Sequence, residues 1–158
     1  MKFGFFMLAL MLAFVSNSPK SKEAGTIRVV SWNVAYGKNF DEVFAGMREL
    51  NADIYVLQEA DFNTKRTGFR NVAAELARGL GYDFIWTNEF EELDQDKSGE
   101  RAFTGQAVLG QKGYMLRLAS EKTFEYQAAK WTPSVFHPRS WTQPRKGGRS
   151  FQCVAVSV

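Results

Sequence analysis

The sequence of 158 residues has only one cysteine, Cys153, and one histidine, His137. A single cysteine excludes an internal disulfide framework and a cysteine-based zinc site, so we expect no disulfide partner within the chain. A single histidine excludes a histidine-rich metal site and leaves almost no room for an internal Ser–His–Asp triad. The chemistry that remains is that of carboxylates, amides, arginine and lysine.

An excess of charge of one sign is also lacking. The formal net charge is +3, and the residues before Thr26 carry three lysines and one glutamate, which leaves +1 for residues 26–158. A net charge this close to zero says little about whether the protein binds nucleic acid. The distribution of charge is more informative: an acidic run lies within 89–96 and a basic run within 139–149. Hydrophobic residues make up 45% and charged residues 23%, which excludes disorder over most of the chain and fits one domain or part of one.

The first 25 residues predict a targeting segment rather than part of the fold. Lys2 is followed by an uninterrupted apolar run over residues 3–15, which is too short for an ordinary transmembrane span. We therefore interpret residues 1–18 as a signal peptide, or as an uncleaved N-terminal anchor because Pro19 is awkward directly after a cleavage site. Residues 19–25 then form a linker, and residues 26–158 form the folded part. The expected location is secreted, periplasmic or anchored near a membrane.

A strand, a helix and a strand are predicted at the start of the folded part. Residues 27–34 and 53–59 are rich in β-branched and apolar side chains, which is typical of buried strands. Between them, apolar residues recur at helical spacing over residues 40–50, where Asn39 or Asp41 can cap the helix. Because a βαβ unit joins parallel strands, we expect the two strands to be adjacent and parallel.

The remainder predicts one more helix, four more strands and two loops. The helix covers residues 69–80 and ends at Gly81. The last strand is hydrophobic and resembles a central strand with partners on both sides, so we expect a chain that is cut within a domain. The predicted strands are 82–87, 105–110, 115–124 and 150–158, and the predicted loops are 88–104 and 130–148.

Two polar residues end the first two predicted strands. Asn33 stands at the carboxyl end of the first strand and Glu59 at that of the second. In parallel α/β units, ligands bind beyond these strand ends, and carboxylate and amide oxygens are ligands for Mg²⁺. The residues alone leave two further interpretations open: Glu59 as an exposed acid, and Asn33 as a turn former before Gly37.

Several motifs in order resemble the endonuclease/exonuclease/phosphatase family, which has the DNase I-like fold. The segments S-W-N-V at 31–34 and A-D-I-Y-V-L-Q-E at 52–59 match the two opening strands of that family. Asp61, Thr64 and Arg66 match a D-x-x-T-x-R stretch that follows the second strand. Further matches are E-L-A at 75–77, L-G-Y at 80–82, G-Q-A-V-L at 105–109 and Q-P-R-K-G-G-R at 143–149.

The resemblance implies a four-layer α/β sandwich and metal-dependent hydrolysis of phosphodiesters or phosphomonoesters. It implies Mg²⁺, or Mn²⁺ in its place, bound by Glu59 and Asn33, with Gln106 and Arg66 in the surrounding shell. Gln106 stands where the family has asparagine in G-N-A. The implied substrate is a phosphate ester: a nucleic acid, a phospholipid or a sugar phosphate.

The sequence departs from the family after its last strand. The family's histidine after that strand, its Asp-x-Asn pair and its terminal Asp-His are not in this sequence, and His137 is interpreted as an ordinary loop histidine. We therefore expect a truncated α/β fold, the N-terminal half of the sandwich, with no catalytic residue of its own and little or no activity.

Two alternatives to a phosphoesterase remain. The first is a non-catalytic remnant that binds nucleic acid or protein through residues 130–149, where Arg145, Lys146 and Arg149 are candidate phosphate ligands and two tryptophans could stack on bases. The second is a small-ligand α/β binding protein without a metal. For this alternative, the sequence offers no glycine-rich phosphate loop, because Gly79 and Gly81 belong to the end of a helix.

Overall fold

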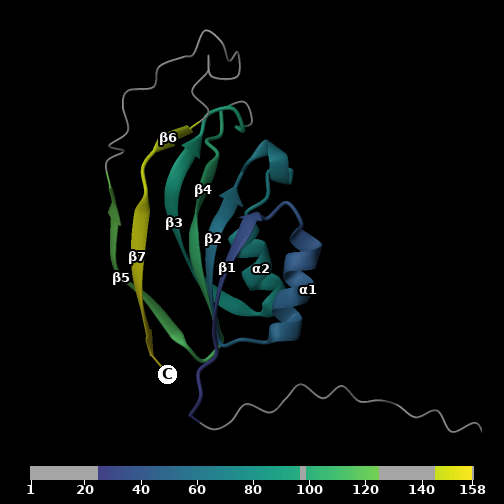
Figure 1. The fold of residues 1–158 in the computed structure, drawn as a ribbon, viewed down its shortest axis with the longest axis vertical. Helices are drawn as coiled ribbons and strands as arrows, with labels where there is room; N and C mark the ends of the chain where they lie inside the picture. Colours follow the sequence, from purple (N-terminus) through teal and green to yellow (C-terminus); the bar gives the residue numbers. More distant parts are fainter. Residues whose placement is uncertain (1–24, 97–98, 125–144, 158) are drawn as a thin grey trace, which may run out of the picture.

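The computed structural model describes residues 25–96, 99–124 and 145–157, and it shows a mixed α/β fold. In these residues, a five-stranded sheet has the strand order β1-β2-β4-β3-β6, and a two-stranded sheet is formed by β5 and β7. Figure 1 shows the five-stranded sheet between two layers, with both helices on one side and β5 and β7 on the other. The predicted α/β class is confirmed, while the predicted fourth layer and the truncation stay predictions. Residues 1–24, which include the predicted signal segment, lie outside the described residues.

The predicted βαβ unit is confirmed. Strand β1 (Val29–Tyr36) lies parallel to strand β2 (Ile54–Phe62), and helix α1 (Phe40–Leu50) connects them. The helix has the predicted bounds because its apolar face, including the buried Val43 and Met47, packs on the sheet. Asn39 occupies the N-cap position, but its side chain makes no capping hydrogen bond.

Helix α2 (Val72–Leu80) begins three residues later than the pattern predicted. Asn71 caps it, because its side-chain oxygen accepts a hydrogen bond from the backbone N–H of Ala74 at 3.0 Å. Phe69 cannot belong to the helix, since its φ of +63° is left-handed. Between the end of β2 and Phe69, the chain forms a short 3₁₀ helix, η1 (Lys65–Thr67).

The predicted acidic loop over residues 88–104 is wrong at both ends. Strand β3 (Tyr82–Glu92) continues through the first five of these residues, and strand β4 (Phe103–Gln111) includes the last two. The two strands pair antiparallel. Acidic side chains can lie within β3 because Glu89 and Glu92, although buried, each form an ion pair with an arginine.

The described chain ends with a short strand of the large sheet followed by a longer strand of the small sheet. Strand β6 (Arg145–Gly147) pairs with β3 at the end of the predicted loop 130–148, while residues 130–144 lie outside the described residues. Strand β7 (Ser150–Ser157) pairs antiparallel with β5 (Met115–Thr123). The prediction of a central strand is wrong for β7 in the described residues, since it has one partner and its Phe151 is 43% exposed.

The core lies between the helices and the large sheet. Met47 and Leu76 on the helices are fully buried against Tyr55 and Leu57 on β2 and Leu109 on β4. The alternate residues of β2 and β4 therefore face away from the helices, toward the side on which β5 and β7 lie (Figure 1). Among the described residues, no helix is long and apolar enough to cross a membrane.

Candidate functional site

The structure aligns three sequence-predicted site residues in one row across three neighbouring strands. Asn33 on β1 pairs in register with Gln58 on β2, and Glu59 is the next residue of that strand. On the other side of β2, the register shifts between Leu57 and Ala60, so that Gln106 on β4 lies opposite Gln58 and Glu59. The row therefore combines one carboxylate with side-chain amides. The prediction that Asn33 and Glu59 end their strands is wrong, because β1 and β2 each continue for three more residues.

The backbone is irregular where this row crosses β1 and β2. Glu59 has a φ of +52°, and Ala35 and Tyr36 have φ values of +48° and +69°. Residues other than glycine rarely adopt left-handed backbone, and each such position costs about 1–3 kcal/mol. β-Bulges re-aim a side chain and are frequent beside active sites. The bulge at Glu59 is thus a local feature that the regular strand pattern did not predict.

The side chain of Glu59 is available to a ligand from outside the chain. It is half-buried, and among the described residues its carboxylate has no hydrogen bond or ion pair. A partly buried carboxylate without a partner is unfavourable unless it is solvated or binds a cation. Glu59 lies within β2 and is half-buried, which does not fit its interpretation as an exposed acid.

Asn33 combines a turn with its place in the row. Its side-chain oxygen accepts a hydrogen bond from the backbone N–H of Ala35 at 2.9 Å, which is an Asx turn ahead of Gly37. The turn-forming interpretation of Asn33 is thus confirmed. Asn33 is also exposed on its strand, and an amide oxygen has two lone pairs, so the turn leaves one of them for another ligand.

Gln106 is held between the two sheets. Its Nε2 donates a hydrogen bond to the backbone oxygen of Ser150 on β7 at 2.9 Å. Its neighbour in register, Thr87, lies 3.0 Å from the side-chain oxygen of Gln152. Close by, the hydroxyl of Ser150 and Nε2 of Gln152 are buried without a hydrogen-bond partner among the described residues. The final strand therefore fixes the orientation of Gln106, which leaves its amide oxygen for other contacts.

Arg66 lies in a network of buried polar side chains beyond the end of β2. Its Nε and Nη2 donate to the two carboxylate oxygens of Asp61 at 2.6 and 2.8 Å. Nη2 also reaches Glu92 at 3.1 Å and the hydroxyl of Thr104 at 2.8 Å. The hydroxyl of Thr64 donates to Asp61. The D-x-x-T-x-R motif thus forms one network, in which Asp61 is completely buried and Glu92 is 2% exposed.

These contacts set the charge states of Arg66 and Glu92. Burial alone would lower the pKa of Arg66, but the hydrogen bond and charge of Asp61, together with Glu92, raise it above its usual value. Burial alone would raise the pKa of Glu92, but hydrogen bonds from Thr104 and Arg145 and the charge of Arg66 hold it below 4.5. Both groups are therefore ionised at neutral pH.

Arg145 connects this network to the end of β1. Its Nη2 lies 2.8 Å from Oε1 of Glu92 and 3.5 Å from the hydroxyl of Tyr36. The guanidinium of Arg66 lies over the ring of Tyr36, at 3.9 Å from its centroid, and that of Arg145 lies at 5.8 Å. Two arginines thus lie at the ring of Tyr36, three residues after Asn33 on β1. The sequence did not predict this contact between distant segments.

The other two predicted phosphate ligands lie apart from this contact. Arg149 pairs with Glu89 at 3.1 Å, and its side chain is 77% exposed. Lys146 is exposed on β6. Of the predicted basic group, the structure therefore brings only Arg145 to Arg66.

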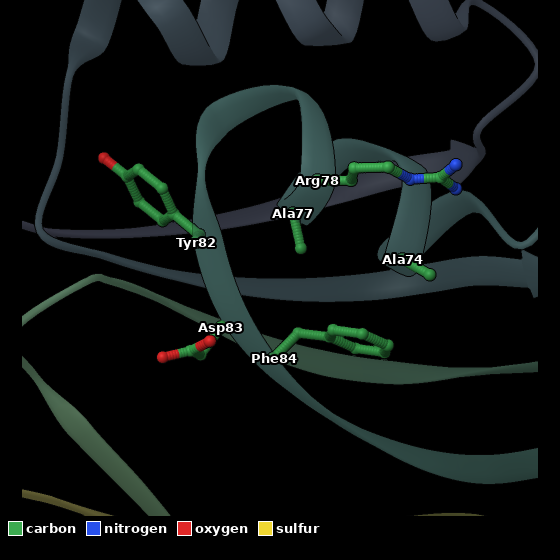
Figure 2. A pocket seen from close by; sticks show the side chains of 6 residues that line it. All are labelled: Ala74, Ala77, Arg78, Tyr82, Asp83 and Phe84. Atoms are coloured by element: carbon green, nitrogen blue, oxygen red, sulfur yellow. The ribbon is translucent and has the colours of Figure 1, made fainter.

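A separate cavity of about 430 Å³ lies beside α2 and the start of β3. Figure 2 shows that Arg78 and Asp83, which line it, extend in different directions. Its polar groups do not converge on one point, and it contains none of the predicted site residues.

The residues present are compatible with a hard cation that takes other ligands as well. Among the described residues, no group of three or more His, Cys, Asp or Glu side chains could hold a metal. One carboxylate with amide oxygens nonetheless fits Mg²⁺, which usually keeps several waters or substrate oxygens. The donor groups of Asn33, Glu59 and Gln106 are therefore of the kind that forms part of a cation site.

No protein-family model matches this sequence, and no curated protein matches it. Among solved structures, the chain is similar to the human Nocturnin catalytic domain, which was determined with a bound sulfate anion. The sequence identity is 17% and the TM-score is 0.42, over 82% of this chain and 48% of that one. The chain thus spans about half the length of that domain. The resemblance of the motifs to the endonuclease/exonuclease/phosphatase family stays a prediction.

Proposed function

We propose that the row of Asn33, Glu59 and Gln106 is the metal-binding part of a phosphoesterase site that takes Mg²⁺ or Mn²⁺. The observation that carries this proposal is the register, which aligns the three residues on adjacent strands with the bulge at Glu59. Glu59 supplies the direct carboxylate ligand, because it has no partner among the described residues. Asn33 and Gln106 supply amide oxygens, and Gln106 is oriented by its hydrogen bond to Ser150.

The basic residues complete the proposal. Arg145 is 35% exposed and lies beside the row, where Glu92 and the hydroxyl of Tyr36 hold its guanidinium, so its charge can attract a phosphate to this edge of the sheet. Arg66 is less exposed, and its contacts with Asp61 and Tyr36 make it a positioning residue. A bound divalent cation would polarise a phosphoryl oxygen and offset the charge that develops there in hydrolysis. Lys146 and Arg149 are exposed enough to attract the rest of a phosphate ester.

The proposed substrate is a phosphodiester or a phosphomonoester, because a divalent cation and basic side chains together bind phosphate oxygens. The apolar N-terminal run makes export part of the proposal, toward a secreted, periplasmic or membrane-anchored location. Because the family's water-orienting histidine and Asp-x-Asn pair are not in this sequence, metal and phosphate binding are better tests than turnover.

The test is denaturant unfolding of the full chain with Mg²⁺ alone, with inorganic phosphate alone, and with both. A ligand that binds only the folded state stabilises it, by about 2.7 kcal/mol at one hundred times its dissociation constant. We expect Mg²⁺ to stabilise the chain and phosphate to add to this only when Mg²⁺ is present. Glu59→Gln should lose both effects, and Glu49→Gln, which changes an exposed carboxylate near the end of α1, should keep them. Stabilisation by phosphate that needs neither Mg²⁺ nor Glu59 would contradict the proposal.

A further inference from the structure

Another cavity, of about 320 Å³, lies beside β1 and the start of α1. Its volume is at the lower end of the range of small-molecule sites, which is enough for a phosphate group. Its lining includes Asn33 of the candidate row and Lys38 from the segment that joins β1 to α1. Glu42, in the first turn of α1, is the one acidic residue of this lining among the described residues. The cavity therefore contains a lysine together with a proposed metal ligand.

The turn that leads to Lys38 is strained and fixed. Ala35, Tyr36 and Gly37 have left-handed backbone in succession, with φ values of +48°, +69° and +77°. A Cβ atom at Gly37 would lie 2.6 Å from the side chain of Val72, which is fully buried, so glycine alone lets the turn pack here. Strained positions that are held by their surroundings are frequent at ligand-binding sites. The core therefore holds the backbone before Lys38 in place.

Lys38 lies at an aromatic ring that two other cations also approach. Its ammonium nitrogen is 5.2 Å from the centroid of the Tyr36 ring. The guanidinium carbons of Arg66 and Arg145 lie 3.9 and 5.8 Å from the same centroid. Tyr36 pairs in register with the residue that follows Glu59. Three positive charges therefore meet at one side chain next to the proposed carboxylate ligand.

The three cations differ in how their charge is compensated. Arg66 forms ion pairs with Asp61 and Glu92, and Arg145 forms one with Glu92. Lys38 is exposed, and its ammonium group forms no ion pair among the described residues. At this ring, two carboxylates therefore balance three cations, and the uncompensated positive charge is that of Lys38.

We propose that Lys38 is a phosphate-binding residue of the proposed site. An ammonium group has three hydrogen-bond donors and is a compact charge, which suits it to the anionic oxygens of a phosphate. The cavity that Lys38 shares with Asn33 places such a phosphate beside the metal ligands. Glu42 has the opposite effect, because its charge repels a phosphate within the same cavity. The inference rests on the proposed function and adds to it a residue that the sequence analysis did not identify.

The test measures the binding of inorganic phosphate to the full chain by isothermal titration calorimetry, with Mg²⁺ in excess. Lys38→Gln removes the charge and should weaken phosphate binding about 10-fold, the low end for a charge-assisted hydrogen bond because Lys38 is exposed. Lys38→Arg keeps the charge and should retain most of the affinity. The matched control is Lys112→Gln, which removes an exposed lysine after β4 and should leave the affinity unchanged. Glu42→Gln should bind phosphate at least as tightly as the wild type.

A separate titration with Mn²⁺ alone distinguishes this inference from the proposed metal site. Lys38→Gln should bind Mn²⁺ no more weakly than the wild type, because Lys38 is not a metal ligand. Equal phosphate affinity of Lys38→Gln and Lys112→Gln would overturn the role of Lys38, and the metal site would still stand if Mn²⁺ binds. A wild-type chain that binds no phosphate would overturn it as well, and the Mn²⁺ titration then shows whether the metal site fails with it.

Discussion

The guanidinium carbon of Arg66 lies over the ring of Tyr36, 3.9 Å from its centroid. This contact joins the segment after β2 to the end of β1, beside the row that contains Asn33 and Glu59. Cation–π contacts of this kind contribute about 0.5–2 kcal/mol, more where the cation is desolvated. Because Arg66 is also bound by Asp61, the buried network and the candidate site are mechanically connected.

Asp61→Asn should destabilise the protein by about 3–5 kcal/mol, because it leaves the charge of Arg66 without its main partner in a buried network. Urea unfolding monitored by tryptophan fluorescence measures this difference. The matched control is Glu91→Gln, which breaks the solvent-exposed pair with Arg101 and should change stability little. A loss of less than about 1 kcal/mol for Asp61→Asn would show that the network is not needed for folding.

Glu92 should make the stability of the protein fall in acid. Its pKa lies below the ordinary value of 4.5 in the folded state, so the stabilisation that it provides is complete above about pH 4.5 and is lost as the pH falls through the folded pKa. Unfolding midpoints in urea, measured from pH 6 downward, should therefore show a gap between wild type and Glu92→Gln that narrows in acid. A gap of constant size over this range would mean that Glu92 does not titrate as the structure requires.

Tyr82 should oppose folding at high pH. Its hydroxyl donates to the backbone oxygen of Ala52 at 2.6 Å, and burial, with the nearby Tyr55 and Asp53, raises its pKa to about 12. A raised folded pKa gives stabilisation that is complete below the ordinary value of 10 and is lost between pH 10 and 12. Tyr82→Phe should lose this dependence and should remove one late-ionising group from the absorbance titration of the tyrosines. An unchanged titration curve would contradict the assignment.

The sequence predicted best the elements whose pattern is local. The spacing of apolar residues gave α1 its observed bounds, and the order strand, helix, strand predicted that β1 and β2 would be parallel neighbours. That arrangement was enough to anticipate that Asn33 and Glu59 lie on neighbouring strands, one register position apart. The late start of α2 was missed because the apolar stripe continues through Phe69, whose left-handed backbone no periodicity reveals.

The parts of the site that were missed depend on contacts between distant segments. Glu92 was interpreted as part of an exposed acidic loop, since the sequence gives no sign that Arg66 and Arg145 both reach it. Arg145 meets Tyr36 across 109 positions of the chain. The bulge at Glu59 is also set by pairing on both sides of β2 and not by local preference. The D-x-x-T-x-R spacing was the one available signal, and its residues form the buried network.

The most direct test of the account is the binding of Mn²⁺ to the full chain, measured by the loss of the free-ion electron paramagnetic resonance signal. The account predicts one site per chain that is lost in Glu59→Gln, weakened in Asn33→Ala and unchanged in Glu49→Gln. Binding that is the same in Glu59→Gln as in the wild type would contradict the central claim, because the only unpartnered carboxylate of the row would then play no part.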